Sequence, residues 1–223
     1  MKIDILTLFP KMFEGPFEES IIKRAQDKNF VQIQIHDLRK WGLDSRRTVD
    51  DRTYGGGVGM IIRVDVIARA ISNFQFPISN KKKRKIILLD PAGEKFTQQK
   101  ALQLSKVEHL ILIAGHYEGV DHRVHEHLVD EVISIGDYVL TGGEIPAMVV
   151  TDTIVRLIPG VLEKPEATLV ESFSQEGVAE FPQYTRPEDY KGWKVPKILL
   201  SGNHKEIEAW RKKNSPISQA PEK

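Results

Sequence analysis

The sequence has no cysteine, so a disulfide framework is excluded and a reducing compartment suits the chain. It has no run of about 18 apolar residues, which a membrane-spanning helix would need. It also has little net charge, because 32 basic and 31 acidic residues leave a formal charge of +1, so any nucleic-acid surface must be a local patch. The short apolar run 1–9 carries Lys2 and Asp4, which is typical of a strand and not of a signal peptide. We expect a soluble, cytoplasmic protein with no membrane partner.

Motifs of several other protein classes are missing as well. The glycine-rich loop at 55–59 does not continue into Gly-Lys-Ser/Thr, so it is not a P-loop. No G-x-G-x-x-G follows a predicted strand, which disfavours a dinucleotide site of the Rossmann type. His122 and His125 share one helix face, but His127 does not and no HExxH is present. A solvated helix face explains these histidines better than a zinc site, and we expect no metal ligands.

What the sequence does contain is a regular alternation of strand-like and helix-like segments, with 40% hydrophobic residues to build a core. Strands are expected at 3–9, 31–35, 85–89, 109–114 and 131–135. Helices are expected at 12–28, at 66–76 after Asp65 as the cap, at 97–106 with Thr97 as the cap, at 121–128 with Asp121 as the cap, and at 147–158. Such alternation predicts an α/β fold with a parallel sheet and helices on both faces.

Three loops follow the ends of predicted strands, at 88–93, 115–121 and 134–146. Parallel strands present such loops at one edge of the sheet, where ligands bind in open α/β folds. The loops are rich in glycine, which lets the backbone approach a ligand without a Cβ in the way. One loop alone would be an ordinary tight turn, but three at one edge predict a small-molecule pocket.

The segment 37–60 is polar, charged and glycine-rich, and it is too long for an ordinary connection. Arginines reach phosphates, and glycines admit a base close to the backbone, so a nucleic-acid loop is favoured over a flexible turn. The basic run 81–85 stays open between a nucleic-acid patch, a localisation signal and a solvated loop.

The alternation ends near residue 158, which suggests three parts. We expect a main domain at 1–160, a linker or lid at 161–184, and a small, mostly helical C-terminal domain at 185–223. The linker region is rich in proline and has no clear period, the tail has helical spacing over 187–213, and residues 215–223 have the composition of a disordered end.

Three long stretches carry a resemblance: SIGDYVLTGGEIP at 134–146, GHYEGVD at 115–121 and TVDDRTYGGGVGM at 48–60. They are similar to the TrmD family, the bacterial tRNA (guanine-N1)-methyltransferases of the SPOUT class. The likeness runs from ILTLFP at 5–10 to LSGNH at 200–204. It implies a deep trefoil knot in the main domain, a homodimer with the active site at the subunit interface, and transfer of a methyl group from S-adenosylmethionine to N1 of the guanosine immediately 3′ of the anticodon in tRNA. A dependence on Mg²⁺ is a further implication.

By this resemblance the three strand-end loops form the S-adenosylmethionine pocket. Its residues would be Leu88, Leu89, Gly115, Tyr117, Glu118, Ile135, Gly136, Asp137, Tyr138, Val139, Leu140, Gly142, Gly143 and Pro146. Backbone groups would hold the adenine, and the carboxylates of Glu118 and Asp137 would favour the cationic sulfonium. The tRNA contacts would be Asp50, Arg52, Gly59 and His116.

Methylation of guanine N1 needs a base for the N1 proton and a cation for the charge that develops on O6. Arg156 matches the family's catalytic arginine. The family's base is an aspartate in the linker, and this chain has Glu171 there, in Glu-Ser-Phe, so we expect Glu171 to accept the proton. Two further departures are His116, where many relatives have arginine, and a tail that stops soon after Trp210. The alternative is an RNA-binding protein on the same fold with weak or no methyl transfer.

Overall fold

The computed structural model describes residues 1–74, 83–164, 168 and 171–216. The chain divides into two compact units, Met1–Glu163 and Lys164–Lys223. The first unit holds a large sheet, and the second holds a hairpin and two short helices. Among the described residues, no helix has both the length and the apolar character that crossing a membrane requires.

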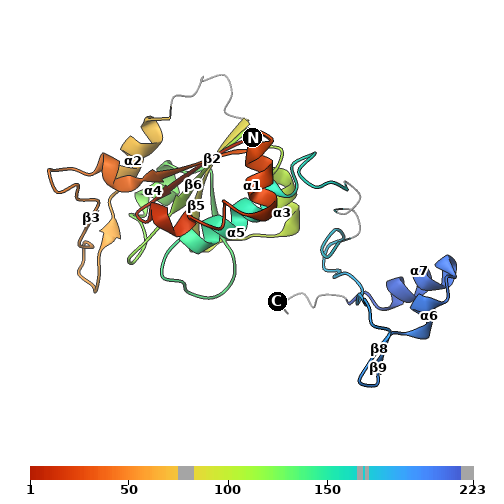
Figure 1. Ribbon diagram of the computed structural model, residues 1–223. Coiled ribbons are helices and arrows are strands. Elements are labelled where there is room, and N and C mark those ends of the chain that lie inside the picture. Colours follow the sequence, from red (N-terminus) through yellow and green to blue (C-terminus); the bar gives the residue numbers. More distant parts are fainter. Residues whose placement is uncertain (75–82, 165–167, 169–170, 217–223) are drawn as a thin grey trace. The chain divides into compact units, whose positions relative to one another are not determined.

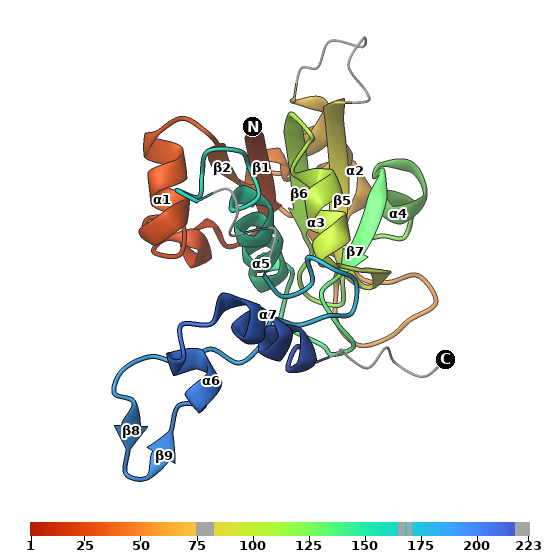
Figure 2. The same cartoon turned by 90° about the vertical axis from the view of Figure 1, so that its right-hand side faces the viewer.

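Five parallel strands form the sheet of the first unit, in the order β2-β1-β6-β5-β7 (Figure 2). Their bounds are Lys2–Thr7 for β1, Gln32–Asp37 for β2, Arg84–Lys95 for β5, His109–Ala114 for β6 and Glu131–Ser134 for β7. All five predicted strands are thus confirmed, as is the parallel sheet. β5 runs on past its predicted end because residues 90–93 form a bulge, after which Lys95 pairs with Ser134.

Helices cover both faces of this sheet, as predicted (Figure 1). On one face lie α1 (Ser20–Asp27), α3 (Gln98–Leu104) and α5 (Glu144–Val155), and on the other lie α2 (Val64–Ser72) and α4 (Arg123–His127). Alternate residues of one strand supply the two cores: Ile87 packs with the first group and Leu88 with the second. Because both faces are buried at the centre of the sheet, β5 and β6 carry continuous apolar runs, whereas the edge strand β2 alternates polar and apolar residues.

The predicted helix at 12–28 is wrong as a single element. The structure has a 3₁₀ turn, η1 (Pro10–Phe13), and then α1 from Ser20. Between them Gly15 has φ +90° and Ser20 has φ +52°, and such left-handed backbone cannot continue a right-handed helix. The apolar residues of this stretch, Phe13, Phe17, Ile22 and Ala25, still reach the same core.

Two of the predicted helix caps are wrong and one is confirmed. Thr97 caps α3, because its hydroxyl accepts a hydrogen bond from the Lys100 amide at 3.2 Å. Asp65 instead lies inside the first turn of α2, where its carboxylate pairs with Arg63 at 3.1 Å. Asp121 stands one residue before the cap, His122. Its carboxylate accepts a hydrogen bond from the amide of Arg123, the first residue of α4. Helix α5 begins at Glu144, three residues before its predicted start. Helix α2 ends at Ser72, and its predicted end at 76 lies outside the described residues.

The long polar segment 37–60 is partly structured. It contains the 3₁₀ turn η2 (Leu38–Trp41), and β3 (Asp50–Asp51) pairs antiparallel with β4 (Ile61–Ile62). We call residues 50–62 the finger. Near its tip the side chains of Tyr54 and Val58 are 99% and 93% exposed, so this element presents its apolar groups outward.

The second unit begins differently from the predicted helical tail. A hairpin of β8 (Asp189–Tyr190) and β9 (Trp193–Lys194) precedes α6 (Lys197–Leu200) and α7 (His204–Lys213). The start of 187–213 is therefore a hairpin and not the predicted helix, and the two helices come after it. The predicted disordered end falls mostly on 217–223, outside the described residues, as do the first two residues of the basic run 81–85. In that run, Lys83 pairs with Glu108 and Lys85 with Glu131, at the edge of the sheet.

A charged side chain is buried inside the first unit, at the start of β1. Asp4 is fully buried, and its carboxylate lies 2.6 Å from Nε2 of His36, 2.5 Å from Nε2 of His109 and 3.0 Å from Nζ of Lys2. Burial by itself raises the pKa of this carboxyl, but the hydrogen bonds from His109, His36 and Lys2 outweigh burial and hold the pKa well below its usual range. The carboxylate therefore ties three neighbouring strands, β2, β1 and β6, together.

Replacing this carboxylate should destabilise the sheet. We expect Asp4→Asn to lower the free energy of unfolding by about 3–5 kcal/mol at pH 7, because Lys2 and the two histidine rings lose their buried carboxylate partner. A folded-state pKa below the unfolded value stabilises the protein above about pH 4, and this contribution is lost as the pH falls further, so the difference from the parent should shrink in acid. Chemical denaturation followed by circular dichroism measures it. Asp27→Asn, which breaks the exposed pair with Lys23, is the control and should change little.

Candidate active site

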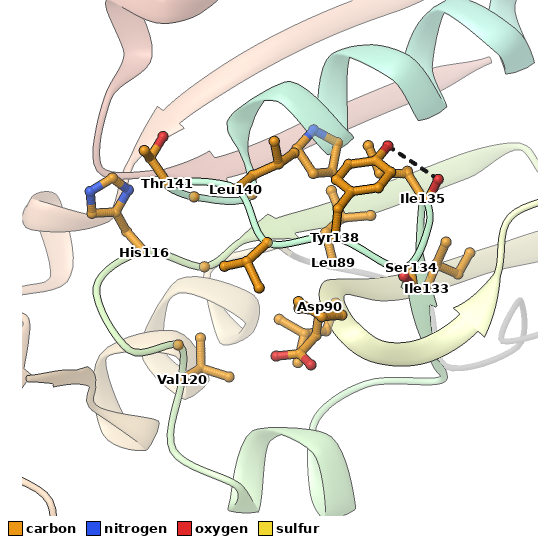
Figure 3. Close-up of a pocket in the computed structure, with 18 of the residues that line it drawn as sticks. Leu89, Asp90, His116, Val120, Ile133, Ser134, Ile135, Tyr138, Leu140 and Thr141 are labelled. Carbon is orange, nitrogen blue, oxygen red and sulfur yellow. Dashed lines mark hydrogen bonds between the residues drawn. The ribbon is translucent and has the colours of Figure 1, made fainter. Parts of the chain in front are cut away.

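A cavity of about 210 Å³ lies at the carboxyl ends of β5, β6 and β7, lined by the three predicted loops (Figure 3). The lining includes these residues predicted for the cofactor: Leu88, Leu89, Gly115, Tyr117, Glu118, Ile135, Gly136, Tyr138, Val139, Leu140, Gly142, Gly143 and Pro146. Asp137 is not among the lining residues, and its carboxylate lies 2.5 Å from Nζ of Lys95 on the surface. The sequence thus led to the correct loops, although the part that each residue plays there stays a prediction.

Sequence reasoning missed several lining residues. They are Asp90, Pro91, Gly119, Val120, Ile133, Ser134 and Thr141. Most of them belong to the same three loops, and the bulge in β5 is what turns Asp90 toward the cavity (Figure 3). The signal that could have found Asp90 is the Asp-Pro pair directly after a buried strand, where polar groups of α/β ligand sites gather.

Two of the loops are held together by backbone contacts that only glycine allows. The Gly143 amide donates to the Gly115 carbonyl at 2.7 Å, and His116 and Gly142 form an antiparallel bridge. A Cβ on Gly143 would lie 2.7 Å from Cα of Ala114, closer than real Cβ contacts. Since the obstructing atoms are backbone, they cannot rotate away. These glycines therefore set the position of one cavity wall.

The loop at 134–146 is folded tightly at its start. The Ser134 carbonyl accepts from the Phe96 amide at 2.8 Å, and its hydroxyl contacts both backbone groups of Gly136. Gly136 has φ +151°, and the ring of Tyr138 covers it, with the phenol hydroxyl donating to the Ile135 carbonyl at 3.3 Å (Figure 3). The loop thus carries Tyr138 to the side of the cavity opposite His116.

A buried carboxylate lies behind the cavity wall. Glu144, at the first turn of α5, is 1% exposed and accepts a hydrogen bond from the Thr7 hydroxyl at 2.8 Å. Its other oxygen lies 3.6 Å from Nδ1 of His116, which is buried and has no hydrogen-bond partner among the described residues. Gly142 leaves room for this pair, because a Cβ there would lie 2.4 Å from both atoms. Nδ1 of His116 thus faces the buried carboxylate across a gap slightly longer than a hydrogen bond.

The finger is fastened to the cavity at its base. The Glu118 amide donates to the Met60 carbonyl at 3.0 Å, and a Cβ on Gly59 would meet the Glu118 side chain at 2.5 Å. Of the predicted tRNA residues, His116 itself lines the cavity, and Gly59 contacts the lining residue Glu118. Asp50 and Arg52 lie along the finger, away from the lining.

The two predicted catalytic residues lie in different units. Arg156 directly follows α5 in the first unit. Glu171 lies in a turn of the second unit, where its carbonyl accepts from the Ser174 amide at 3.1 Å. Phe173 in the same turn has φ +64°, which is uncommon for a residue other than glycine and marks a sharply bent segment.

In the part of the chain that the structure describes, no three histidine, aspartate or glutamate side chains are grouped closely enough to hold a metal ion. The rings of His122 and His125 stack on one another with centroids 5.0 Å apart. The dependence on Mg²⁺ therefore stays an implication of the resemblance, and no chemical step is assigned to the ion.

A family model described as tRNA (guanine-1)-methyltransferase TrmD matches residues 1–220. The chain belongs to the TrmD family. It is 53% identical over 215 residues to a tRNA (guanine-N(1)-)-methyltransferase of Dictyoglomus turgidum, covering 96% of this chain and 85% of the relative. Proteins of the same name from Bacillus subtilis and Bacillus pumilus are 53% and 52% identical, each over 96% of this chain and 87% of the relative.

Membership of the TrmD family confirms the resemblance. The close contact at Gly143 allows the predicted cofactor pocket to be tested. We expect Gly143→Val to remove binding of S-adenosylmethionine while the fold persists, because a branched side chain must push the wall loop off the end of β6. Isothermal titration calorimetry measures the affinity, and circular dichroism reports the fold.

Gly15→Ala is the control for a glycine substitution away from the cavity: its Cβ meets no atom within 4 Å, and the left-handed φ of +90° costs stability without disturbing the cavity lining. It should bind the cofactor like the parent. Unchanged affinity in a folded Gly143→Val chain would contradict the role assigned to this wall.

Proposed function

We propose that this chain transfers a methyl group from S-adenosylmethionine to N1 of the guanosine immediately 3′ of the anticodon in tRNA, in the cytoplasm. The relatives that share about half of its residues are named tRNA (guanine-N(1)-)-methyltransferase. The observation that carries the proposal is the cavity at three adjacent strand ends, walled by glycine backbone. A protein that only bound RNA would have no use for such a cavity, so the RNA-binding alternative is not favoured.

The direct test is methyl transfer from labelled S-adenosylmethionine to an unmodified tRNA transcript. A transcript with adenosine in place of the target guanosine is the control and should accept no label. Failure of the purified chain to label the unmodified transcript, with cofactor binding intact, would overturn the proposed activity.

The cavity fits S-adenosylmethionine in its chemistry. Leucine and isoleucine side chains offer apolar surface to an adenine ring, and the exposed backbone amides and carbonyls of the glycine-rich loops can read its polar edge. Glu118 adds a carboxylate to the lining, which favours a cation. When bound, this cofactor supplies a methyl group on a positively charged sulfur.

Two residues of the chain would perform the remaining chemistry. The carboxylate of Glu171 accepts the N1 proton of guanine, and the guanidinium of Arg156 stabilises the negative charge on O6. Glutamate is one methylene longer than the aspartate expected at this position, so it reaches the same proton from a backbone slightly further away. The finger, through Asp50, Arg52 and Gly59, would hold the target nucleotide and its neighbours, with His116 beside the cavity.

We further propose the deep trefoil knot of the SPOUT class for residues 1–160. The course of the chain after β7 supports it, because β7 is one edge of the sheet and the loop at 134–143 must cross the ends of β5 and β6. The chain then enters α5, whose first residue, Glu144, bonds Thr7 in β1. The division into a main domain, a linker or lid at 161–184 and a small C-terminal domain at 185–223 remains part of this proposal.

A homodimer is proposed as well, with the linker of one subunit completing the pocket of the other. Helix α5 supports it, since its inner face packs on the sheet while Ile145 and Val149 stay 44% and 41% exposed on the outside. Met12 of η1, an element that α5 contacts, is also exposed at 40%. A helix that is apolar on both faces is normally covered on both.

Replacing the base should slow the chemistry alone. We expect Glu171→Gln to lower the single-turnover rate of methyl transfer by roughly 10²–10⁴-fold, which is what a positioned base contributes. Cofactor affinity should stay unchanged, because the side chain acts on guanine. Glu171→Asp should retain much of the activity, and Glu176→Gln, an exposed carboxylate on the same segment, is the control. A parental rate for Glu171→Gln would remove this residue from the mechanism.

Charge on the outer face of α5 should prevent assembly. We expect Val149→Asp to give a monomer by light scattering and to lose methyl transfer, since a carboxylate in an apolar interface loses its hydration. Leu102→Asp is the matched control, because Leu102 of α3 is 49% exposed and belongs to no proposed interface. A Val149→Asp chain that still forms dimers would place the interface elsewhere.

Mixing two inactive chains tests whether the linker acts across the dimer. Gly143→Val lacks a working pocket and Glu171→Gln lacks the base, but a mixed dimer contains one intact combination. After subunit exchange at equal amounts, we expect about a quarter of the parent activity, since half of the dimers are mixed and each has one good site. No recovery in dimers shown to be mixed would mean that pocket and base come from one chain.

A further inference from the structure

The hairpin of the second unit displays an aromatic pair to solvent. The side chains of Tyr190 and Trp193 are 51% and 74% exposed, and their ring centroids are 5.8 Å apart. The two residues are directly opposite in the antiparallel register, so both rings lie on one face of the hairpin. In Figure 2 this hairpin projects from the rest of the second unit.

The turn of the hairpin holds this display in place. Lys191 and Gly192 have φ +56° and +87°, the pattern of a tight two-residue turn whose twist suits paired strands. The Gly192 amide donates to the Asp189 carboxylate at 2.8 Å, which closes the loop. Two strands of two residues contribute little stability of their own, so exposing two large rings here gives the fold no evident benefit.

The charge around the rings is positive. Nζ of Lys191 lies 5.5 Å from the centre of the Tyr190 ring, and the exposed Lys194 is on the neighbouring strand. Between Tyr184 and Asn214 the sequence has eight lysines and arginines against four acidic residues, although the whole chain has a charge of only +1. Of the acidic groups nearest the rings, Asp189 is already engaged with the turn and, at 3.7 Å, with Lys194.

We propose that Tyr190 and Trp193 form a stacking platform for an unpaired base of the tRNA, while Lys191 and Lys194 contact its phosphates. Aromatic faces bind bases of any identity, and adjacent lysines bind the backbone, which is the combination that single-stranded nucleic-acid sites use. A second copy of the chain could cover the aromatic rings, but the lysines beside them favour an anionic partner. The proposal rests on tRNA as the substrate, and it adds a contact outside both the finger and the linker.

Removing the platform should weaken tRNA binding without affecting the chemistry. We expect Trp193→Ala to raise the Kd for tRNA and the KM of methyl transfer by about 5- to 150-fold, the equivalent of one lost stacking contact. The kcat at saturating tRNA and the affinity for S-adenosylmethionine should stay at parental values. Trp193→Phe should recover most of the binding, since it restores an aromatic face.

The matched control is Leu200→Ala in α6, which removes exposed apolar surface from the same unit without removing a ring. It should bind tRNA like the parent. A perfectly paired RNA duplex is the second control, because it offers no unpaired base: the parent and Trp193→Ala should bind it equally.

Direct binding separates this inference from the proposed activity. If the parent binds tRNA but does not methylate it, the proposed function fails, and a weaker Kd for Trp193→Ala still supports the platform. If Trp193→Ala binds tRNA like the parent, the platform is refuted while methyl transfer stands. A Trp193→Ala chain that changes oligomeric state in light scattering and keeps parental tRNA affinity also refutes it and assigns the rings to a contact between copies.

Discussion

The contact on which the rest of the first unit depends is the close approach of Gly142 and Gly143 to the end of β6. It leaves no space for a side chain, and the amide of Gly143 bonds the carbonyl of Gly115 at its centre. Directly behind it, Glu144 bonds Thr7 in β1 and faces His116. One backbone contact therefore positions the cavity wall, the start of α5 and the buried carboxylate together. Any shift that widened the wall would also pull α5 away from the sheet.

The position of α5 then determines both what the unit buries and what it leaves open. Ala147, Val150 and Ile154 are fully buried against the sheet, while Ile145 and Val149 face outward. A helix with polar residues on its outer face would be solvated there and would need no further covering. Because this one continues its apolar character outward, the pocket wall and an exposed apolar surface are set by the same helix.

The sequence predicts the sheet well because apolar strands buried on both faces leave a strong signal, and it locates the pocket because loops at parallel strand ends must meet. It fails where geometry is decided by a few atoms. Three features leave no periodic pattern in the sequence. They are the break before Ser20, the two-residue strands of both hairpins, and the outward turn of Asp137 toward Lys95. Asp65 shows the same limit, since a neighbouring arginine competes for a carboxylate that would otherwise cap the helix.

A nearly neutral chain can still recognise a polyanion if its charges are unevenly distributed and its contacts do not rely on charge alone. The basic run next to the sheet is partly neutralised, as Lys83 and Lys85 pair with glutamates. By contrast, the finger and the β8–β9 hairpin both expose an aromatic ring beside glycine, Tyr54 in one and Trp193 in the other. Rings read unpaired bases, which a folded RNA offers at few places, so such contacts select a loop where a polycation would bind any phosphate backbone. On the proposal that both rings contact tRNA, the low net charge favours specificity for a particular RNA loop over general affinity for nucleic acid.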